Sequence, residues 1–197
     1  IGLTFAQVLR SFLRQDPNVI LVGEIRDRET AAIAIQAALT GHLVVSSVHT
    51  NDAPGAVGRL LDMGIEPFLV ASAVSLILAQ RLVRRNCPAC RQATSLTPAE
   101  QEQLGLVQAP SSLQVWQGVG CPACFGTGYR GRVALAERMP VSPALADLIS
   151  QRVSVQALRR QAIQEGMRPL RADGLAKLAQ GITSPAEVLR ETLGVDT

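Results

Sequence analysis

Apolar residues recur along the chain at two different spacings, and these spacings predict an alternating order of helices and strands. Residues 4–14 carry apolar side chains at the three-to-four-residue interval of an amphipathic helix. Residues 19–22 are apolar throughout and mostly β-branched, which is typical of a parallel strand covered on both faces. A second helix is expected over residues 31–39, where Asp27 can cap its first turn. A second strand follows over residues 43–48.

This order of strand, helix and strand predicts an α/β fold with two parallel strands. The carboxyl ends of parallel strands lie at the same edge of a sheet, which is where ligands bind in open α/β folds. Glu24 comes just after the first strand, and His49 comes just after the second. We therefore expect both side chains to face one cleft at this edge.

The rest of the chain reads as helices with one returning strand. In order, we expect helices over residues 54–63 and 66–80, a short segment over 81–85, a strand over 131–138 and a helical tail. The last helix opens with Ser184, Pro185, Ala186 and Glu187. Serine followed three residues later by glutamate predicts a capping box, and proline suits the first helical position.

Composition narrows the class of protein further. With 197 residues and 47% hydrophobic content, the chain can bury one domain and a smaller appendage. The net charge of +3 is too weak a bias to indicate nucleic acid as the main ligand. The longest apolar candidate, residues 68–79, contains two serines and falls short of the roughly 20 residues that cross a bilayer. The chain starts at Ile1 and its first residues read as the middle of a fold, so we expect a fragment.

All four cysteines stand in two identical Cys-Pro-Ala-Cys units, which contain Cys87, Cys90, Cys121 and Cys124. Each unit can bring two thiolates to one ion, and two units complete a tetrahedral zinc site with no open position. Nothing in the sequence indicates secretion, so a structural Zn²⁺ is favoured over disulfides. Redox-active or simply buried cysteines are the alternative. Residues 92–118 between the units are rich in Ser, Thr, Pro and Gln and are expected to protrude.

Several segments, in the right order, resemble the ATPases of type II secretion and type IV pilus assembly. Residues 14–27 (RQDPNVILVGEIRD) are similar to the family's modified Walker B segment, and residues 40–53 (TGHLVVSSVHTNDA) to its histidine box. Further matches are GRLLDMG at residues 58–64, AQRLVRR at 79–85, GMRPLR at 166–171 and DGL at 173–175. The resemblance covers essentially the whole chain.

This resemblance implies a nucleotide site and a role for several side chains. Glu24 is expected to position or polarise the attacking water, and His49 to sense the γ-phosphate. The nucleotide-sensing residues that the family implies are His49, His42, Arg26 and Arg59. His42 lies before the second strand, at the opposite end from His49. Without the resemblance, Arg26 and Arg59 would be interpreted as solvated or paired surface charges. ATP and Mg²⁺ are the implied ligands of the intact protein.

A phosphate-binding loop is absent from the sequence. Such a loop needs Gly-x-x-x-x-Gly-Lys-Ser/Thr, and the sole lysine, Lys177, lies outside any segment of that form. The chain is therefore expected to be the C-terminal part of a RecA-like P-loop NTPase domain, with an inserted tetracysteine zinc lobe and a helical C-terminal tail. On this basis residues 1–86 form the ATPase core, 87–128 the zinc lobe, and 129–197 the returning strand and helical subdomain. Alone, the chain is expected neither to bind ATP tightly nor to hydrolyse it.

The resemblance also implies an assembly and a location. It implies a homo-hexamer, cytoplasmic and peripheral to the inner membrane, where ATP hydrolysis drives pseudopilus or pilus assembly through membrane platform proteins. The tetracysteine element makes the chain more similar to assembly and secretion ATPases than to retraction motors. Type II protein secretion is the expected function, with type IV pilus assembly as the alternative.

A zinc-dependent binding module is the alternative from a different class. Residues 121–128 (CPACFGTG) match the C-x-x-C-x-G-x-G repeat of J-domain chaperones, but only one such repeat is present and residues 1–85 stay unexplained. A zinc-ribbon nucleic-acid binder would use the basic residues Arg81, Arg84, Arg85, Arg91, Arg130 and Arg132. Aromatic residues make up only 3% of the chain, which leaves few to stack on bases, so no specific nucleic acid is expected.

Overall fold

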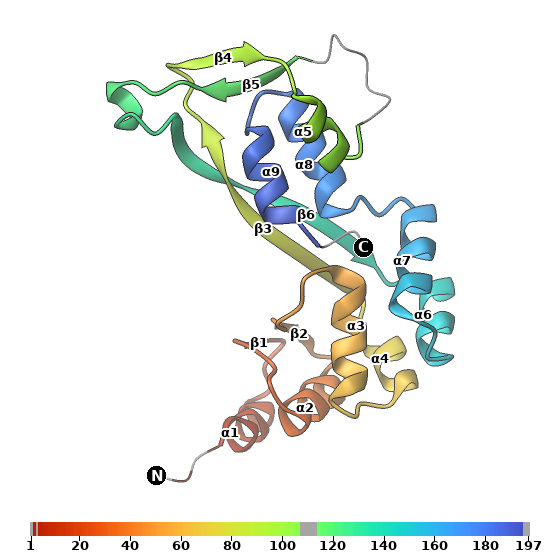
Figure 1. Ribbon diagram of the computed structural model, residues 1–197. Helices are drawn as coiled ribbons and strands as arrows, with labels where there is room; N and C mark the ends of the chain where they lie inside the picture. The colour runs from red at the N-terminus through yellow and green to blue at the C-terminus, as the bar shows by residue number, and fades with distance from the viewer. Residues whose placement is uncertain (1, 3, 107–113, 195–197) are drawn as a thin grey trace. The chain divides into compact units, whose positions relative to one another are not determined.

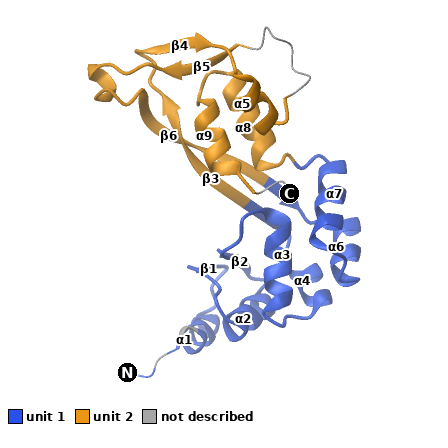
Figure 2. Ribbon diagram, viewed as in Figure 1, with its two compact units in different colours: residues 1–78, 138–167 blue, residues 79–137, 168–197 orange. Residues whose placement is uncertain are grey.

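The computed structural model describes residues 2, 4–106 and 114–194, and Figure 1 shows the course of the chain. These residues form two compact units (Figure 2). Unit 1 contains residues 1–78 and 138–167, and unit 2 contains residues 79–137 and 168–197. Each unit is therefore built from two stretches of chain that lie far apart in the sequence.

Unit 1 combines a pair of parallel strands with helices. Its elements are α1 (Phe5–Phe12), the 3₁₀ turn η1 (Leu13–Gln15), β1 (Val19–Val22), α2 (Arg28–Leu39), β2 (Leu43–Ser46), α3 (Ala53–Asp62), α4 (Pro67–Ala73), α6 (Pro143–Ser150) and α7 (Val155–Gln164). The predicted parallel pairing is confirmed, with Val19 opposite Leu43 and Val22 opposite Ser46. The predicted cap is confirmed as well, because the Asp27 carboxylate accepts a hydrogen bond from the Thr30 N–H at 2.8 Å.

The two faces of the β1–β2 pair differ in exposure. Ile20 and Val22 are buried, as are several side chains of α2. On the other face the exposed fractions are 60% for Val19, 76% for Leu21, 59% for Leu43 and 47% for Val45. The prediction that residues 19–22 are covered on both faces is therefore wrong for the described part of the chain, since that part buries only one face. We call Val19, Leu21, Leu43 and Val45 the open face.

The helices of unit 1 pack in pairs. α3 contacts α7, α4 contacts α6, and α6 contacts α7 in turn. A Cβ added at Gly58 of α3 would lie 3.2 Å from the Val155 side chain of α7, so a glycine allows these two helices to approach closely. Among the described residues, no helix combines the length and the apolar character needed to cross a bilayer.

Unit 2 holds the remaining elements and the ends of two long strands. These elements are β3 (Leu76–Asn86), β4 (Arg91–Thr94), α5 (Pro98–Gln103), β5 (Val115–Gly118), the 3₁₀ turn η2 (Pro122–Cys124), β6 (Tyr129–Pro140), α8 (Leu170–Ala179) and α9 (Pro185–Thr192). β3 pairs with β6, and β4 pairs with β5 in antiparallel fashion. The predicted strand at residues 131–138 is confirmed as part of β6.

The helix expected over residues 66–80 is wrong in its second half. α4 ends at Ala73, and the chain then forms β3, whose first side chains alternate in exposure as a strand requires. The partner strand β6 begins more than 40 residues after β3 ends, as their bounds show. A helical spacing of apolar residues was therefore overridden by backbone pairing with a segment that local sequence cannot reveal.

The segment at residues 92–118, expected to protrude, contributes three side chains to the core of unit 2 in its described part. Three of its side chains, Leu96, Leu104 and Val115, are buried in a cluster with Leu178 of α8 and Val188 of α9. These apolar residues are spaced too widely to give a periodic signal in a polar stretch. The polar composition therefore concealed a contribution to the core of unit 2.

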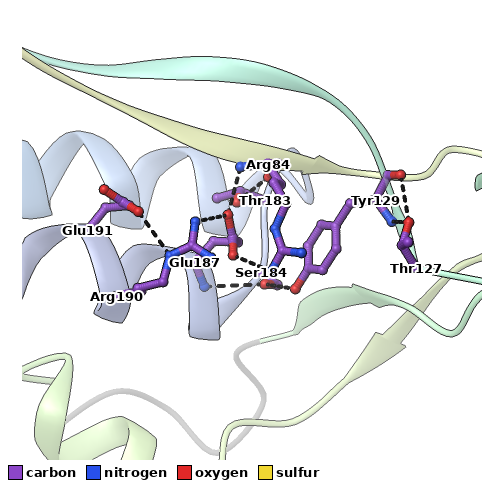
Figure 3. A network of polar contacts seen from close by, with 8 residues as sticks. All are labelled: Arg84, Thr127, Tyr129, Thr183, Ser184, Glu187, Arg190 and Glu191. Atoms are coloured by element: carbon purple, nitrogen blue, oxygen red, sulfur yellow. Dashed lines mark hydrogen bonds and ion pairs between the residues drawn. The ribbon is translucent and has the colours of Figure 1, made fainter.

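The start of α9 carries a polar network that the predicted capping box did not anticipate (Figure 3). Ser184 accepts a hydrogen bond from the Glu187 N–H, which is one half of the box. The Glu187 carboxylate, only 1% exposed, instead accepts from the Arg84 backbone N–H and from the Arg84 guanidinium, both at 2.8 Å. It also pairs with Arg190 at 3.0 Å. The other half of the box is absent because Glu187 is turned to these partners.

Arg84 is held in this network from other sides as well. Its guanidinium lies over the Tyr129 ring at 4.1 Å, and the Tyr129 hydroxyl is 2.8 Å from the Ser184 hydroxyl. Burial acts to raise the pKa of Glu187. The hydrogen bonds from Arg84, with the charges of Arg84 and Arg190, outweigh that effect and hold the pKa below its ordinary value. Glu187 is therefore a buried carboxylate that stays ionised at neutral pH.

Candidate functional site

The loops that follow β1 and β2 are joined just beyond the carboxyl ends of the strands. The Ile25 N–H donates to the Ser47 carbonyl at 2.8 Å, and the Ser47 hydroxyl donates to the Gly23 carbonyl at 2.8 Å. These two bonds extend the contact between the chain segments past the last sheet pair. As a result, the residues after each strand are presented side by side at one edge.

Glu24 is the centre of this edge. Its Oε2 lies 2.9 Å from His49 Nε2, and its Oε1 forms an ion pair with the Arg26 guanidinium. The structure thus brings together three of the residues that sequence reasoning singled out. Arg26 is the largest cause that lowers the pKa of Glu24, and the hydrogen bond with His49 lowers it further. Glu24 is therefore present as a carboxylate at neutral pH, with its two oxygens oriented by two different side chains.

The other two candidates, His42 and Arg59, lie elsewhere in unit 1. His42 precedes β2, at the end of the strand opposite to His49, and its Nδ1 lies 3.0 Å from the Ala37 carbonyl and 3.2 Å from the Thr40 hydroxyl. Arg59 lies exposed in the last turn of α3. Neither is among the hydrogen-bond or ion-pair partners of Glu24 in the described residues.

A buried ion pair next to this edge was missed by the sequence analysis. Asp52 caps α3, because its Oδ1 accepts from the Gly55 N–H at 2.6 Å. Its Oδ2 pairs with the Arg159 guanidinium from α7, and the two side chains are only 12% and 16% exposed. An aspartate just before Ala-Pro-Gly could have been recognised as a cap. No local signal identifies Arg159, which lies 107 residues further along the chain.

The four cysteine sulfurs converge in unit 2. All four Sγ atoms lie within 4.8 Å of one another. Individual separations are 3.9 Å for Cys87–Cys121, 3.8 Å for Cys90–Cys124 and 3.7 Å for Cys121–Cys124. Four thiolates at the usual Zn–S distance of about 2.3 Å in a tetrahedron stand about 3.8 Å apart. The donor set and its spacing therefore fit a four-thiolate zinc ion.

Backbone groups also prepare these sulfurs for a metal. Cys124 Sγ accepts N–H bonds from Cys121 at 3.2 Å and from Gly128 at 3.3 Å. Burial alone would raise the pKa of the Cys124 thiol, but the N–H donors and the neighbouring thiols lower it to about 6. Burial raises the pKa of Cys90 to about 11. A cation at the centre would favour the thiolate form of all four.

The turns that carry the cysteines are held against the body of unit 2. Asn86, next to Cys87, uses its side-chain amide to donate to the carbonyls of Trp116 at 2.9 Å, Thr183 at 2.9 Å and Gly181 at 3.2 Å. A Cβ at Gly118 would lie 1.9 Å from the Gly128 carbonyl oxygen, so only glycine permits the backbone to pass there. These contacts fix the distance between the two cysteine turns.

Comparison with known proteins decides the family. The family model described as "Type II/IV secretion system protein" matches residues 1–190. The chain belongs to this family. Its curated relatives include the type IV pilus assembly ATPase PilB of Myxococcus xanthus, 51% identical over 98% of this chain and 34% of its own length. The type II secretion system ATPase E of Vibrio cholerae is 50% identical over 98% of this chain and 38% of its own length.

These relatives confirm the resemblance seen in the sequence, and both kinds of system are represented at nearly equal identity. The chain spans about a third of the length of the curated relatives it matches. Among solved structures, the Legionella pneumophila ATPase DotB matches with a TM-score of 0.66 at 23% identity, over 94% of this chain and 41% of that chain. The pilus retraction motor PilT with bound ADP matches with a TM-score of 0.66 at 24% identity, over 96% and 44%. These structures show that the α/β fold is shared.

Proposed function

We propose that this chain supplies the carboxylate side of an ATP-hydrolysing site in a motor for type II secretion or type IV pilus assembly. One observation carries the proposal: Glu24 and His49, from two loops, meet at the carboxyl edge of two parallel strands. Ligands of open α/β folds bind at that edge. The curated relatives, about 50% identical over 98% of this chain, are named as pilus assembly and secretion ATPases.

The geometry suits phosphoryl transfer to water. An ionised Glu24 accepts a hydrogen bond from a water molecule and aligns it for attack on the γ-phosphate. His49 Nε2 lies 2.9 Å from Glu24 Oε2. A shift of the histidine toward a phosphate oxygen would therefore free this carboxylate oxygen to bind the attacking water. Arg26 keeps the carboxylate charged by its ion pair with Oε1. Bound Mg²⁺ would offset the charge of the phosphates.

The phosphate-binding half of the site must come from residues outside this chain. The sole lysine, Lys177, forms an ion pair with Asp173 within α8. Asp173 also accepts from the Ala136 N–H at 2.9 Å, so this pair links α8 to β6 in unit 2. Lys177 thus has a structural role in unit 2. We therefore propose that the chain alone neither binds ATP tightly nor hydrolyses it.

The cysteine cluster gives the proposal its second part. Cys87, Cys90, Cys121 and Cys124 hold one structural Zn²⁺, and residues 87–128 form a tetracysteine lobe between the ATPase core of residues 1–86 and the segment of residues 129–197. The core belongs to a RecA-like domain. We further propose, from the family resemblance of the sequence, that the intact protein forms a homo-hexamer on the cytoplasmic side of the inner membrane and acts on membrane platform proteins.

The test is ATP turnover by the full-length protein that contains this chain. Glu24→Gln preserves the shape of the side chain but removes the charge that aligns water, so turnover should fall by about a hundredfold or more while nucleotide binding persists. Glu29→Gln is the matched control, because Glu29 forms an exposed ion pair with Arg10 on the same unit. Wild-type turnover in Glu24→Gln would refute the catalytic assignment.

A further inference from the structure

The buried ion pair between Asp52 and Arg159 lies next to the proposed catalytic edge but belongs to a different part of unit 1. Asp52 ends the loop that begins after β2 and carries His49. Arg159 lies in α7, which enters unit 1 from the second of its two chain segments. The pair therefore joins the His49 loop to a helix more than 100 residues away.

Both oxygens of the Asp52 carboxylate are in use. Oδ1 caps α3 through the Gly55 N–H at 2.6 Å, and Oδ2 pairs with the Arg159 guanidinium. The Asp52 carbonyl also accepts a hydrogen bond from the Thr50 hydroxyl at 2.9 Å. This bond closes the loop directly after His49. Asp52 is therefore tied to Thr50, the residue next to His49, by one hydrogen bond and two peptide units.

The surroundings of Asp52 leave the pair little freedom to rearrange. A Cβ added at Gly55 would lie 2.5 Å from Asp52 Oδ1, so the cap fits only around a glycine. Gly58, one turn further along α3, meets Val155 in the first turn of α7. The helix that Asp52 caps and the helix that carries Arg159 are thus in contact at two levels. Because both charged side chains are largely buried, loss of the charge on either one removes compensation from the other.

From this geometry we infer that Arg159 is a positioning residue: through Asp52 it holds the His49 loop in the conformation that places His49 against Glu24. The inference rests on the proposed function, since it names the device that orients the catalytic edge. Arg159 itself touches neither Glu24 nor His49 among the contacts described. Its effect on catalysis is therefore indirect, exerted through Asp52 and the His49 loop.

Asp52→Asn is the most informative variant. Asparagine caps helices about as well as aspartate, so its Oδ1 can still accept from the Gly55 N–H. The amide nitrogen then faces the Arg159 guanidinium, where two donors meet and the ion pair is lost. Arg159→Met removes the charge from the other side while keeping much of the apolar stem. Arg160→Met is the matched control, because Arg160 is the exposed neighbour on the same helix.

The chain contains two histidines, so the environment of His49 can be followed directly by NMR of the imidazole groups. His49 and His42 should give two resolved imidazole signals in a proton–carbon correlation spectrum of this chain. We expect the His49 signals to shift in Asp52→Asn and in Arg159→Met, and to stay in place in Arg160→Met. His42 contacts Ala37 and Thr40 and serves as the internal reference. Arg159→Lys, which retains a cation near Asp52, should return the His49 signals toward their wild-type positions.

A second measurement links the spectrum to turnover in the full-length protein. Asp52→Asn should lower kcat by about tenfold or more and change KM for ATP little, because the loop geometry and not nucleotide affinity is altered. His49 signals that do not move in either Asp52→Asn or Arg159→Met would overturn the inference. Equal shifts of His42 and His49 would also overturn it, because the ion pair would then support unit 1 as a whole. Failure of the proposed function is recognised separately, by normal turnover in Glu24→Gln.

Discussion

Replacement of Glu187 by glutamine should destabilise unit 2 far more than a change of one carboxylate to an amide does on a protein surface. Glu187 is 1% exposed and accepts from the Arg84 backbone N–H and from the guanidinium groups of Arg84 and Arg190. Glutamine offers one acceptor oxygen in place of two. Its amide nitrogen must therefore face at least one donor in the interior.

The expected cost follows from these contacts. Two charge-assisted hydrogen bonds become neutral or are lost, at about 1 kcal/mol each after allowance for the half-exposed arginines. Glu187→Gln should thus lower the free energy of unfolding by about 2 kcal/mol. Glu187→Ala also leaves the Arg84 N–H without its acceptor, which brings the total to about 4 kcal/mol. Glu191→Gln is the control on the same helix, since Glu191 is more exposed and pairs only with Arg190, at 2.9 Å, in the described network. This substitution should lower the free energy of unfolding by at most about 0.5 kcal/mol.

The pH dependence gives a second, independent measure. Because the folded-state pKa of Glu187 is lowered, its contribution is fully present above the unfolded value of about 4.3 and is lost as pH falls through the folded pKa. Urea unfolding followed by the fluorescence of Trp116 should show the gap between wild type and Glu187→Gln closing below about pH 4. A gap under about 0.5 kcal/mol at pH 7, or one that persists unchanged in acid, would refute the assignment of the stabilisation to this carboxylate.

Two further predictions concern the cysteine cluster and its support. The purified chain should contain about one zinc ion, and a chelator that removes it should expose four reactive thiols. Removal should also change the fluorescence emission of Trp116, which lies in β5, between the two cysteine turns in the sequence. Metal-free protein with freely reactive thiols would contradict the zinc assignment. Asn86→Ala should lower the free energy of unfolding by about 2–3 kcal/mol, because it removes the amide group whose two protons are shared among three carbonyl groups. Gln92→Ala on the exposed strand β4 should have little effect in the same urea assay.

Local signals in the sequence were enough to place Glu24 and His49 together at one edge of the strand pair. The β1–α2–β2 order, the Asp27 cap and the positions of Glu24 and His49 all follow from residues close together in the chain, where periodicity and capping chemistry act. The same holds for the cysteines, whose repeated spacing predicted their convergence in space. What was predicted correctly is what short stretches of chain decide by themselves.

Contacts over long sequence distances explain the errors. β3 was expected to continue a helix because its partner β6 is invisible to a local pattern. Glu187 was assigned to a capping box, but Arg84, 103 residues away, offers it a backbone N–H and a guanidinium in the interior. Asp52 and Arg159 were overlooked for the same reason. In each case the decisive partner lies far along the chain: for β3 it is a strand, for Glu187 it replaces half of the capping box, and for Asp52 it adds to the local cap.

The open face of the β1–β2 pair affects the tendency of this chain to self-associate in solution. Its four apolar side chains form two cross-strand pairs, Val19 with Leu43 and Leu21 with Val45. Together they present one continuous hydrophobic surface to water. Salts such as ammonium sulfate strengthen the burial of apolar surface, so self-association of the chain should grow with their concentration. Dilute, low-salt buffer is therefore the condition in which its metal content and histidine signals are best measured.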